Sequence, residues 1–142
     1  MALTSESTTL WIGDLKSGSG TISLDSSEAA EFPVTWAART EGEVGKTNPE
    51  ELLGAAHASC FAMQFSGLLT KAGTPPQSLQ VTAAVTFDPA GGSILGCHLL
   101  VSAKVDGTTD EAFQKLAAEA KDTCPVSRAL SGITITLEAS LG

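Results

Sequence analysis

The three cysteines, Cys60, Cys97 and Cys124, are the side chains of this 142-residue chain with the widest choice of chemistry. A cysteine can be a small core hydrophobe, a metal ligand or, as thiolate, a nucleophile that attacks peroxides and disulfides. Three cysteines so far apart are too few for the disulfide framework of a small secreted domain. Each one must therefore be judged from its surroundings.

Cys60 lies in an apolar stretch that predicts a helix, and polar residues share its side of that helix. At about 100° per residue, Leu53, His57, Cys60 and Gln64 fall in an arc roughly 60° wide. A polar stripe on an apolar helix needs partners or a purpose. Two interpretations remain open: a core cysteine beside a histidine that bonds a backbone carbonyl, or a reactive thiol.

Cys124 opens the sequence Cys-Pro-Val-Ser between two predicted helical segments. If Pro125 starts a new turn, Cys124 lies at its N-terminus, where the helix dipole favours thiolate. A half-buried cap is the alternative. Cys97 differs, because it falls on the apolar face of a predicted strand and is expected to be a core residue.

Two other uses of these side chains are less favoured. Structural zinc usually takes closely spaced pairs of ligands, whereas Cys97 and His98 point to opposite faces of a strand. His57, Cys60 and Cys124 would supply only three ligands. A cysteine hydrolase could use His57 as its base, one helical turn from Cys60, but nothing in the sequence marks an oxyanion hole or an acyl substrate.

The elements that position these residues form an α+β pattern, in the order βββ-α-ββ-α-β, in which adjacent strands are able to pair antiparallel. Alternating apolar residues and turn signals predict the strands, and helical spacing predicts the helices. The predicted strands are Thr8–Ile12, Gly20–Leu24, Phe32–Ala38, 79–88, 95–105 and 133–139; the helices are Asn48–Ala72 and Asp110–Asp122, with a helical turn in Cys124–Leu130.

The predicted helix around Cys60 is long and apolar on nearly every side. Asn48 is a suitable N-cap, Pro49 suits the first helical position, and Glu51 stands where a capping-box glutamate reaches back. A helix that is apolar all round is buried. At roughly 37 Å it exceeds the width of a domain of this size, so we expect a second copy of the chain to cover it. The sequence thus predicts a homodimer.

Composition narrows the remaining choices. The net charge is −8 and the eight basic residues are scattered, so no basic stripe is available for nucleic acid. The polar start of the chain does not resemble a signal peptide, and no run of about 18 apolar residues predicts a membrane span. We expect one soluble domain over residues 1–142, located in the cytoplasm, with neither nucleic acid nor membrane as partner.

Three segments together resemble the OsmC/Ohr family of organic hydroperoxide reductases. They are 39–43 (RTEGE), 48–61 (NPEELLGAAHASCF) and 124–127 (CPVS). At two positions, the histidine at position 57 and the valine after Cys124-Pro125, the sequence resembles the OsmC branch of the family. The resemblance implies an OsmC-like fold, a long central helix with an antiparallel sheet, and an intertwined homodimer. It also implies a peroxidase of oxidative and osmotic stress defence that works without metal, haem or flavin.

The resemblance also implies roles for individual residues. Cys60 matches the peroxidatic cysteine, Cys124 the resolving one, and Arg39 and Glu50 the charged pair beside the reactive thiol. Reducing equivalents are expected from dihydrolipoyl groups on proteins. The expected substrate-binding residues are His57, Phe61, Met63 and Gln64. Phe65 adds to the apolar surface that Phe61 and Met63 offer to an organic peroxide.

Helix geometry limits how that charged pair can reach the thiol. Ten residues of straight helix separate Glu50 from Cys60, about 15 Å. Either the helix breaks near Gly54 or Glu50 comes from the other subunit, and we expect the second. A redox-sensing or ligand-binding module on the same fold, and a zinc-stabilised structural protein, remain as alternative functions.

Overall fold

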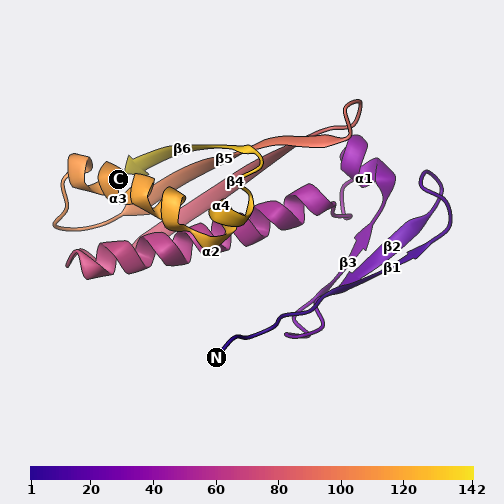
Figure 1. The fold of residues 1–142 in the computed structure, drawn as a ribbon, viewed down its shortest axis with the longest axis horizontal. Coiled ribbons are helices and arrows are strands. Elements are labelled where there is room, and N and C mark those ends of the chain that lie inside the picture. The colour runs from indigo at the N-terminus through magenta and orange to yellow at the C-terminus, as the bar shows by residue number, and fades with distance from the viewer. The chain divides into compact units, whose positions relative to one another are not determined.

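A computed structural model describes residues 1–142, and the chain divides into two compact units, Met1–Leu52 and Leu53–Gly142. Figure 1 labels the elements of both. Each unit is described by itself. The predicted α+β class and the order βββ-α-ββ-α-β are confirmed, with one short helix added at Trp36–Thr40, and the helical turn predicted in Cys124–Leu130 is present as the short helix Pro125–Ala129. A single domain over residues 1–142 stays a prediction.

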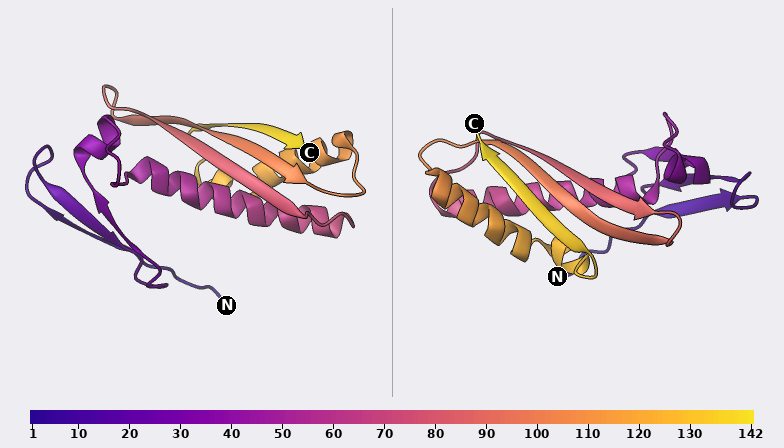
Figure 2. Two further views of the ribbon diagram at one scale, coloured as in Figure 1. Left: turned by 180° about the vertical axis from the view of Figure 1, so that it is seen from behind. Right: turned by 90° about the horizontal axis from the view of Figure 1, so that it is seen from above.

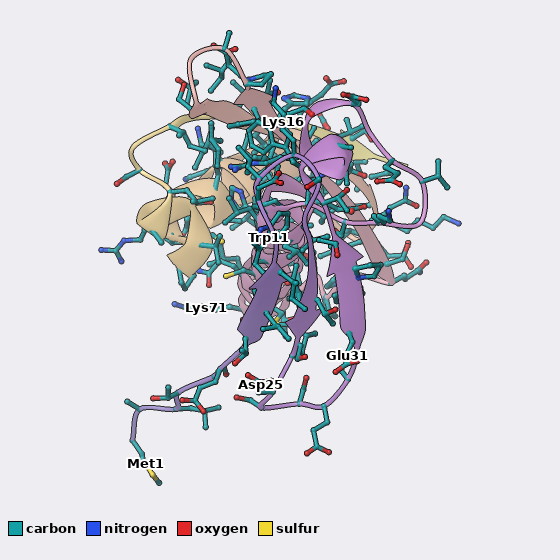
Figure 3. The ribbon with its side chains drawn as sticks, turned by 90° about the vertical axis from the view of Figure 1, so that its right-hand side faces the viewer. Met1, Trp11, Lys16, Asp25, Glu31 and Lys71 are labelled. Carbon is teal, nitrogen blue, oxygen red and sulfur yellow. The ribbon has the colours of Figure 1, made fainter.

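The first unit is a three-stranded antiparallel sheet in the order β1-β2-β3. Its strands are β1 (Thr8–Ile12), β2 (Ser19–Ser23) and β3 (Glu31–Val34). Gly20 pairs with Trp11 across the sheet. A Cβ at Gly20 would stand 2.9 Å from the Trp11 ring, so only glycine lets the indole lie over this strand. Figure 3 shows Trp11 on this sheet, and Asp25 and Glu31 at its far end.

The third strand ends earlier than the sequence predicts. Instead of continuing to Ala38, the chain turns into helix α1 (Trp36–Thr40). The reason is local: the Thr35 hydroxyl accepts a hydrogen bond from the backbone N–H of Ala38 at 3.1 Å and caps the new helix. This short helix carries Arg39, so the turn at Thr35 decides where the side chain of a candidate site residue lies.

The second unit has a sheet in the order β4-β5-β6. Strands β4 (Ser78–Asp88) and β5 (Ser93–Lys104) form an antiparallel hairpin, whereas β6 (Thr134–Leu141) pairs with β5 in parallel. The expected all-antiparallel pairing is therefore wrong for the last strand. Helices α3 (Asp110–Thr123) and α4 (Pro125–Ala129) form the crossover that parallel pairing requires. Figure 2 shows these strands from two further sides.

One face of the β4-β5-β6 sheet supports the core of this unit. Helices α2 and α3 pack on that face, with Phe65 between Phe61 and Phe113 at ring-centroid distances of 5.7 and 5.2 Å. Leu95, which the alternation places with the core, is 56% exposed. A register shift between Thr86 and Phe87 changes the pairing at that end of the hairpin.

Helix α2 (Pro49–Lys71) agrees with the predicted helix to within one residue at each end. The Asn48 side chain accepts from the backbone N–H of Glu51 at 2.8 Å, as an N-cap does. Glu51 does not complete a capping box, since its carboxylate accepts from the Thr47 hydroxyl at 2.6 Å. Gly73 has φ of 83°, and the N–H of Thr74 reaches the Leu69 carbonyl at 3.0 Å, which closes the helix.

A single chain buries only some sides of α2. One side, with Phe61, Phe65 and Leu69, is fully buried, while Met63 on another side is 74% exposed. Further exposed positions of this helix are Ala55, Ala56, Ser59, Gly67 and Thr70. By length and composition α2 could also cross a membrane, a property that it shares with core helices of soluble proteins. Its small exposed residues leave room for another surface.

Candidate active site

Cys60 and Cys124, far apart in the sequence, are brought together in the second unit. Cys60 packs against the core cluster that contains Cys124, the Cys124 thiol is near enough to change the pKa of Cys60, and both cysteines are free thiols. Cys60, on α2, is partly exposed, whereas Cys124, at the junction of α3 and α4, is fully buried. Of the two interpretations of Cys124, the half-buried cap is wrong in its burial, although Cys124 is the N-cap residue of the helix that starts at Pro125. A reagent from solvent meets Cys60 first, and Cys124 stands behind it.

The environment of Cys60 sets its acidity. Burial raises the pKa of the Cys60 thiol, a hydrogen bond from the backbone N–H of Val126 lowers it, and the neighbouring Cys124 raises it again. The second unit therefore holds this thiol mostly protonated at neutral pH. A peroxidatic thiolate needs a positive group as well, which neither Val126 nor Cys124 supplies.

His57 is fully buried and takes part in two side-chain contacts. Its Nδ1 lies 3.2 Å from the Cys97 sulfur and its Nε2 lies 2.6 Å from the Ser127 hydroxyl. Burial lowers the pKa of His57 and raises that of Cys97. The expectation that Cys97 is a core residue is confirmed, and its thiol lies at the end of a buried chain of hydrogen bonds.

Arg39 and Glu50 form a tight ion pair within the first unit. The guanidinium donates from Nη2 to Glu50 Oε1 at 2.8 Å, and from Nε to both carboxylate oxygens at 3.1 and 3.2 Å. The Glu50 side chain is 7% exposed and the Arg39 side chain 29%. Arg39 also stands 6.0 Å from the centroid of the Trp36 ring. A carboxylate gripped in this way fixes the guanidinium as a rigid cationic surface.

Arg39 and Glu50 of this ion pair belong to the same chain. The expectation that Glu50 reaches Cys60 from the other subunit stays a prediction. Helix α2 is continuous through Gly54, so the alternative of a break there is not observed. Arg128, four residues after Cys124, is exposed on α4.

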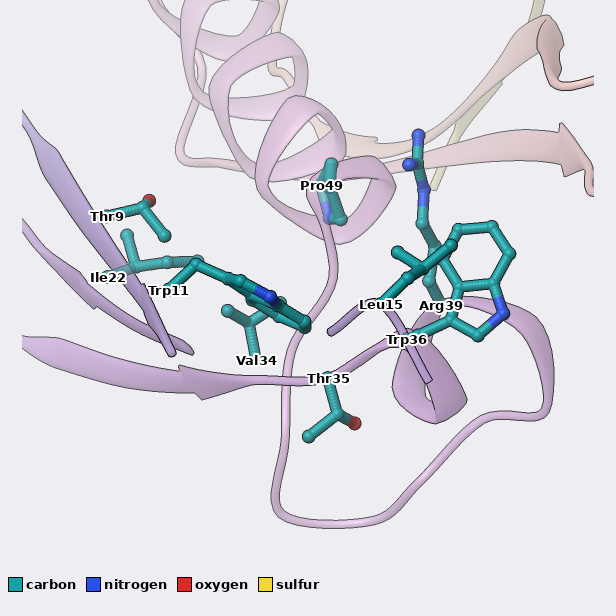
Figure 4. A pocket seen from close by; sticks show the side chains of 9 residues that line it. All are labelled: Thr9, Trp11, Leu15, Ile22, Val34, Thr35, Trp36, Arg39 and Pro49. Atoms are coloured by element: carbon teal, nitrogen blue, oxygen red, sulfur yellow. The ribbon is translucent and has the colours of Figure 1, made fainter. Parts of the chain in front are cut away.

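An apolar pocket lies beside Arg39 in the first unit (Figure 4). Its volume is about 370 Å³, and Trp11, Trp36 and Leu15 contribute large apolar surfaces. The remaining lining residues are Thr9, Ile22, Val34, Thr35, Arg39 and Pro49. In Figure 4 the two indoles lie on different sides of the opening, on β1 and α1. The pocket combines apolar walls with one cation, as an organic molecule with a polar head requires.

The four residues expected to bind substrate lie in different places. His57 and Phe61 are fully buried, so neither is exposed in this chain. Gln64 donates from Nε2 to the Thr123 hydroxyl at 2.8 Å, which ties α2 to the end of α3. Met63 is the most exposed of the four. A substrate role for these residues stays a prediction.

Sequence reasoning missed two parts of the site. The Trp11 and Trp36 pocket was hidden because the second indole was assigned to a strand. Ser127 was noticed only as part of the Cys-Pro-Val-Ser motif, although its spacing of three residues from Cys124 places it on the inner side of a helical turn. Both belong to short helices, which leave little periodic signal. No group of three His, Cys, Asp or Glu side chains gathers here as a metal site.

The fold and the paired cysteines define a class of small thiol-based redox proteins. A family model described as OsmC-like protein matches residues 40–138, and the chain belongs to that family. The chain is 43% identical over 133 residues to peroxiredoxin OsmC of Escherichia coli, and the aligned region covers 92% of each chain.

Solved structures agree with this assignment. An organic hydroperoxide resistance protein from Elizabethkingia anophelis, crystallised with thiocyanate, matches with a TM-score of 0.71 at 25% identity, over 100% of this chain and 97% of the other. The organic hydroperoxide resistance protein OhrB of Bacillus subtilis matches with a TM-score of 0.67 at 22% identity, over 99% and 98%. The expected OsmC-like fold is therefore confirmed.

Proposed function

We propose that this chain, a peroxidase of the OsmC-like family, reduces organic hydroperoxides with Cys60 as the attacking and Cys124 as the resolving thiol. The observation that carries the proposal is that these two free cysteines lie close together in one cluster. Two neighbouring free thiols, one partly exposed and one fully buried, suit a reaction that ends in a disulfide between them. The physiological setting that we infer is defence against oxidative and osmotic stress.

The first step is the attack of the Cys60 thiolate on the terminal oxygen of the hydroperoxide. The sulfur–oxygen bond forms as the O–O bond breaks, and the alkoxide that leaves takes up a proton to become the alcohol. The sulfur is oxidised by two electrons to a sulfenic acid, and the peroxide is reduced by two.

In the second step the Cys124 thiol attacks the sulfenic sulfur. The S–S bond forms, the S–O bond breaks, and the hydroxide leaves with the Cys124 proton as water. Because the two cysteines are already neighbours, this closure needs little movement. A dithiol, which we infer to be a protein-bound dihydrolipoyl group, then reduces the disulfide through a mixed disulfide and is itself oxidised.

We assign to Arg39 the positive charge that Cys60 lacks. A fixed guanidinium favours thiolate over thiol and stabilises the negative oxygen that leaves. Glu50, ten residues before Cys60 in a continuous α2, holds Arg39, so we infer that the pair serves Cys60 of a second copy of the chain. The exposed small residues of α2 supply a surface on which that copy can pack. The functional unit that we propose is a homodimer.

The apolar pocket beside Arg39 supports bulky organic hydroperoxides as substrates. Its indole and aliphatic walls exclude water and favour a hydrocarbon tail, while the guanidinium attracts the peroxide oxygens. Hydrogen peroxide has no tail to bury and gains nothing from these walls. We therefore expect a preference for substrates such as cumene hydroperoxide.

Intact mass measured after one equivalent of cumene hydroperoxide tests the proposal. We expect the loss of two hydrogen atoms, with peptide mapping that joins Cys60 to Cys124. A gain of one oxygen that persists would contradict a resolving role for Cys124. No change in mass, or turnover too slow to measure with dihydrolipoamide, would favour a redox-sensing or ligand-binding module instead.

A further inference from the structure

A buried chain of hydrogen bonds runs from the sheet of the second unit to the helix that follows Cys124. It starts at Cys97 on β5, passes through His57 on α2 and ends at Ser127 on α4. Cys97 is 3% exposed, His57 0% and Ser127 6%. The reaction proposed above uses none of these three side chains. A polar chain of this kind in an apolar core calls for an explanation.

Neutral His57 satisfies both neighbours without any buried charge. In one arrangement the Cys97 thiol donates to Nδ1 and Nε2–H donates to the Ser127 oxygen. In the other, Ser127 donates to Nε2 and Nδ1–H donates to the sulfur. In either arrangement, one ring nitrogen of His57 donates a hydrogen bond and the other accepts one, so both nitrogens have a partner.

The Ser127 end of this chain acts on the residues around the reactive sulfur. Helix α4 has five residues, too few to be stable without tertiary contacts. Its first turn holds Cys124 by the bond from the Arg128 N–H to the Cys124 carbonyl at 3.0 Å, and it presents the Val126 N–H to Cys60. The Ser127 side chain is the one buried residue of the helix, and its hydroxyl bonds to His57.

We propose that His57 and Ser127 are positioning residues that anchor α4 to α2 and so keep the Cys124 sulfur and the Val126 N–H against Cys60. His57 and Cys60 are one turn apart on the same helix, so the anchor and the reactive thiol share one rigid support. With the anchor released, α4 moves away, and closure of the disulfide slows relative to further oxidation of the sulfenic acid.

The two amide replacements of histidine separate the halves of the chain. In His57→Gln the amide nitrogen stands near the position of Nε2 and can still reach Ser127. In His57→Asn it stands near Nδ1 and reaches only Cys97. We expect His57→Asn and Ser127→Ala to close the disulfide about five-fold more slowly than wild type, and His57→Gln to stay within about two-fold of it.

The experiment follows one equivalent of cumene hydroperoxide by quenching with dimedone, which labels only the sulfenic acid, and by intact mass. We expect a longer-lived dimedone adduct, and more protein with two added oxygens, in the two variants that lose the Ser127 contact. Leu69→Ala, which removes a fully buried side chain at the other end of α2, is the stability-matched control and should close at the wild-type rate.

A second readout does not depend on peroxide. Combined with Cys124→Ser, the variants are alkylated at Cys60 over a range of pH. Loss of the anchor should move the half-maximal rate to higher pH, because the Val126 N–H no longer favours thiolate. Equal closure rates and equal alkylation profiles in His57→Asn and His57→Gln would overturn the inference. Wild type that forms no disulfide would instead contradict the proposed function, and the alkylation profile would still test the anchor.

Discussion

Glu50 grips Arg39 with both carboxylate oxygens, and the glutamate is the more deeply buried of the two side chains. The pair joins α1 to the first turn of α2 within one compact unit. Because the Glu50 carboxylate is largely shielded from water, this is not an ordinary surface ion pair. The two-pronged contact with the carboxylate leaves the guanidinium of Arg39 little freedom to move. The main effect of the ion pair is to fix the orientation of the guanidinium, and its contribution to folding stability is the smaller one.

The first prediction follows from that clamp. Arg39→Lys should lower kcat/KM for cumene hydroperoxide by about 10- to 100-fold, since a lysine keeps the charge but not the fork. Glu50→Gln should have an effect of similar size and cost about 1–2 kcal/mol of stability. Lys46→Gln is the control, because Lys46 pairs with Glu43 in an exposed bridge of the same unit. Wild-type kinetics in Arg39→Lys would refute the assigned role.

The second prediction separates the three cysteines. Cys60→Ser should abolish hydroperoxide reduction, and Cys124→Ser should allow one oxidation of Cys60 without sustained turnover. Cys97→Ser should remain active and lose about 1 kcal/mol of stability, because its hydroxyl can still bond His57. Consumption of peroxide in a coupled dihydrolipoamide assay measures all three. An active Cys60→Ser protein would be incompatible with the mechanism.

The third prediction concerns the acidity of Cys60. Burial is the main cause of its raised pKa, and the neighbouring Cys124 adds to it, since two adjacent thiolates repel each other. Cys124→Ala removes the second cause, so the pH at which Cys60 is alkylated at half its maximal rate should fall. Iodoacetamide labelling followed by peptide mapping measures this directly. A midpoint that stays in place or rises would show that the two thiols are not coupled.

Much of the fold was predictable because its signals are local and repeated. Helix α2 has Asn48 and Gly73 at its ends, and the alternation of β4 and β5 marks their buried face. What could not be predicted depends on a single contact. The turn at Thr35 that makes α1 rests on one hydroxyl, and the parallel pairing of β6 is decided by the α3 crossover.

In the candidate site, too, the residues that belong to a sequence motif could be predicted, whereas those that depend on a single tertiary contact could not. The motifs single out Cys60 and Cys124, but only coordinates show that His57 bonds Ser127 and that Trp11 and Trp36 line one pocket. His57 looks like a neighbour of Cys60 in a helical projection, because both lie in one narrow arc. Burial distinguishes them: the ring is fully enclosed and the thiol is not.

The fourth prediction concerns the exposed side of α2. Met63 is 74% exposed, so Met63→Glu should leave the fold of a single chain intact. If a second copy packs there, a buried carboxylate without a partner disfavours association, and sedimentation should show a shift from dimer to monomer. Activity should fall with the dimer. Lys71→Gln, at an exposed position at the end of the same helix, changes the net charge by the same single unit and is the control. Wild type that sediments as a monomer at micromolar concentration would refute the dimer itself.

The fifth prediction links the buried histidine to the pH dependence of stability. Burial lowers the pKa of His57 from its ordinary value of 6.5, so between the two values the unfolded chain binds a proton that the folded chain does not. The free energy of unfolding should therefore be unaffected by His57 above about pH 7.5 and fall as the pH drops through 6.5, by at most about 1.4 kcal/mol per pH unit. Below the folded pKa this contribution levels off.

Urea denaturation of wild type and His57→Gln from pH 8 to pH 5 measures this effect. The glutamine keeps a hydrogen bond to Ser127 but cannot titrate, so its stability should change less over this interval. Profiles of wild type and His57→Gln that run parallel down to pH 5 would mean that His57 accepts its proton as easily in the folded chain as in water, and the neutral chain from Cys97 to Ser127 would have to be abandoned.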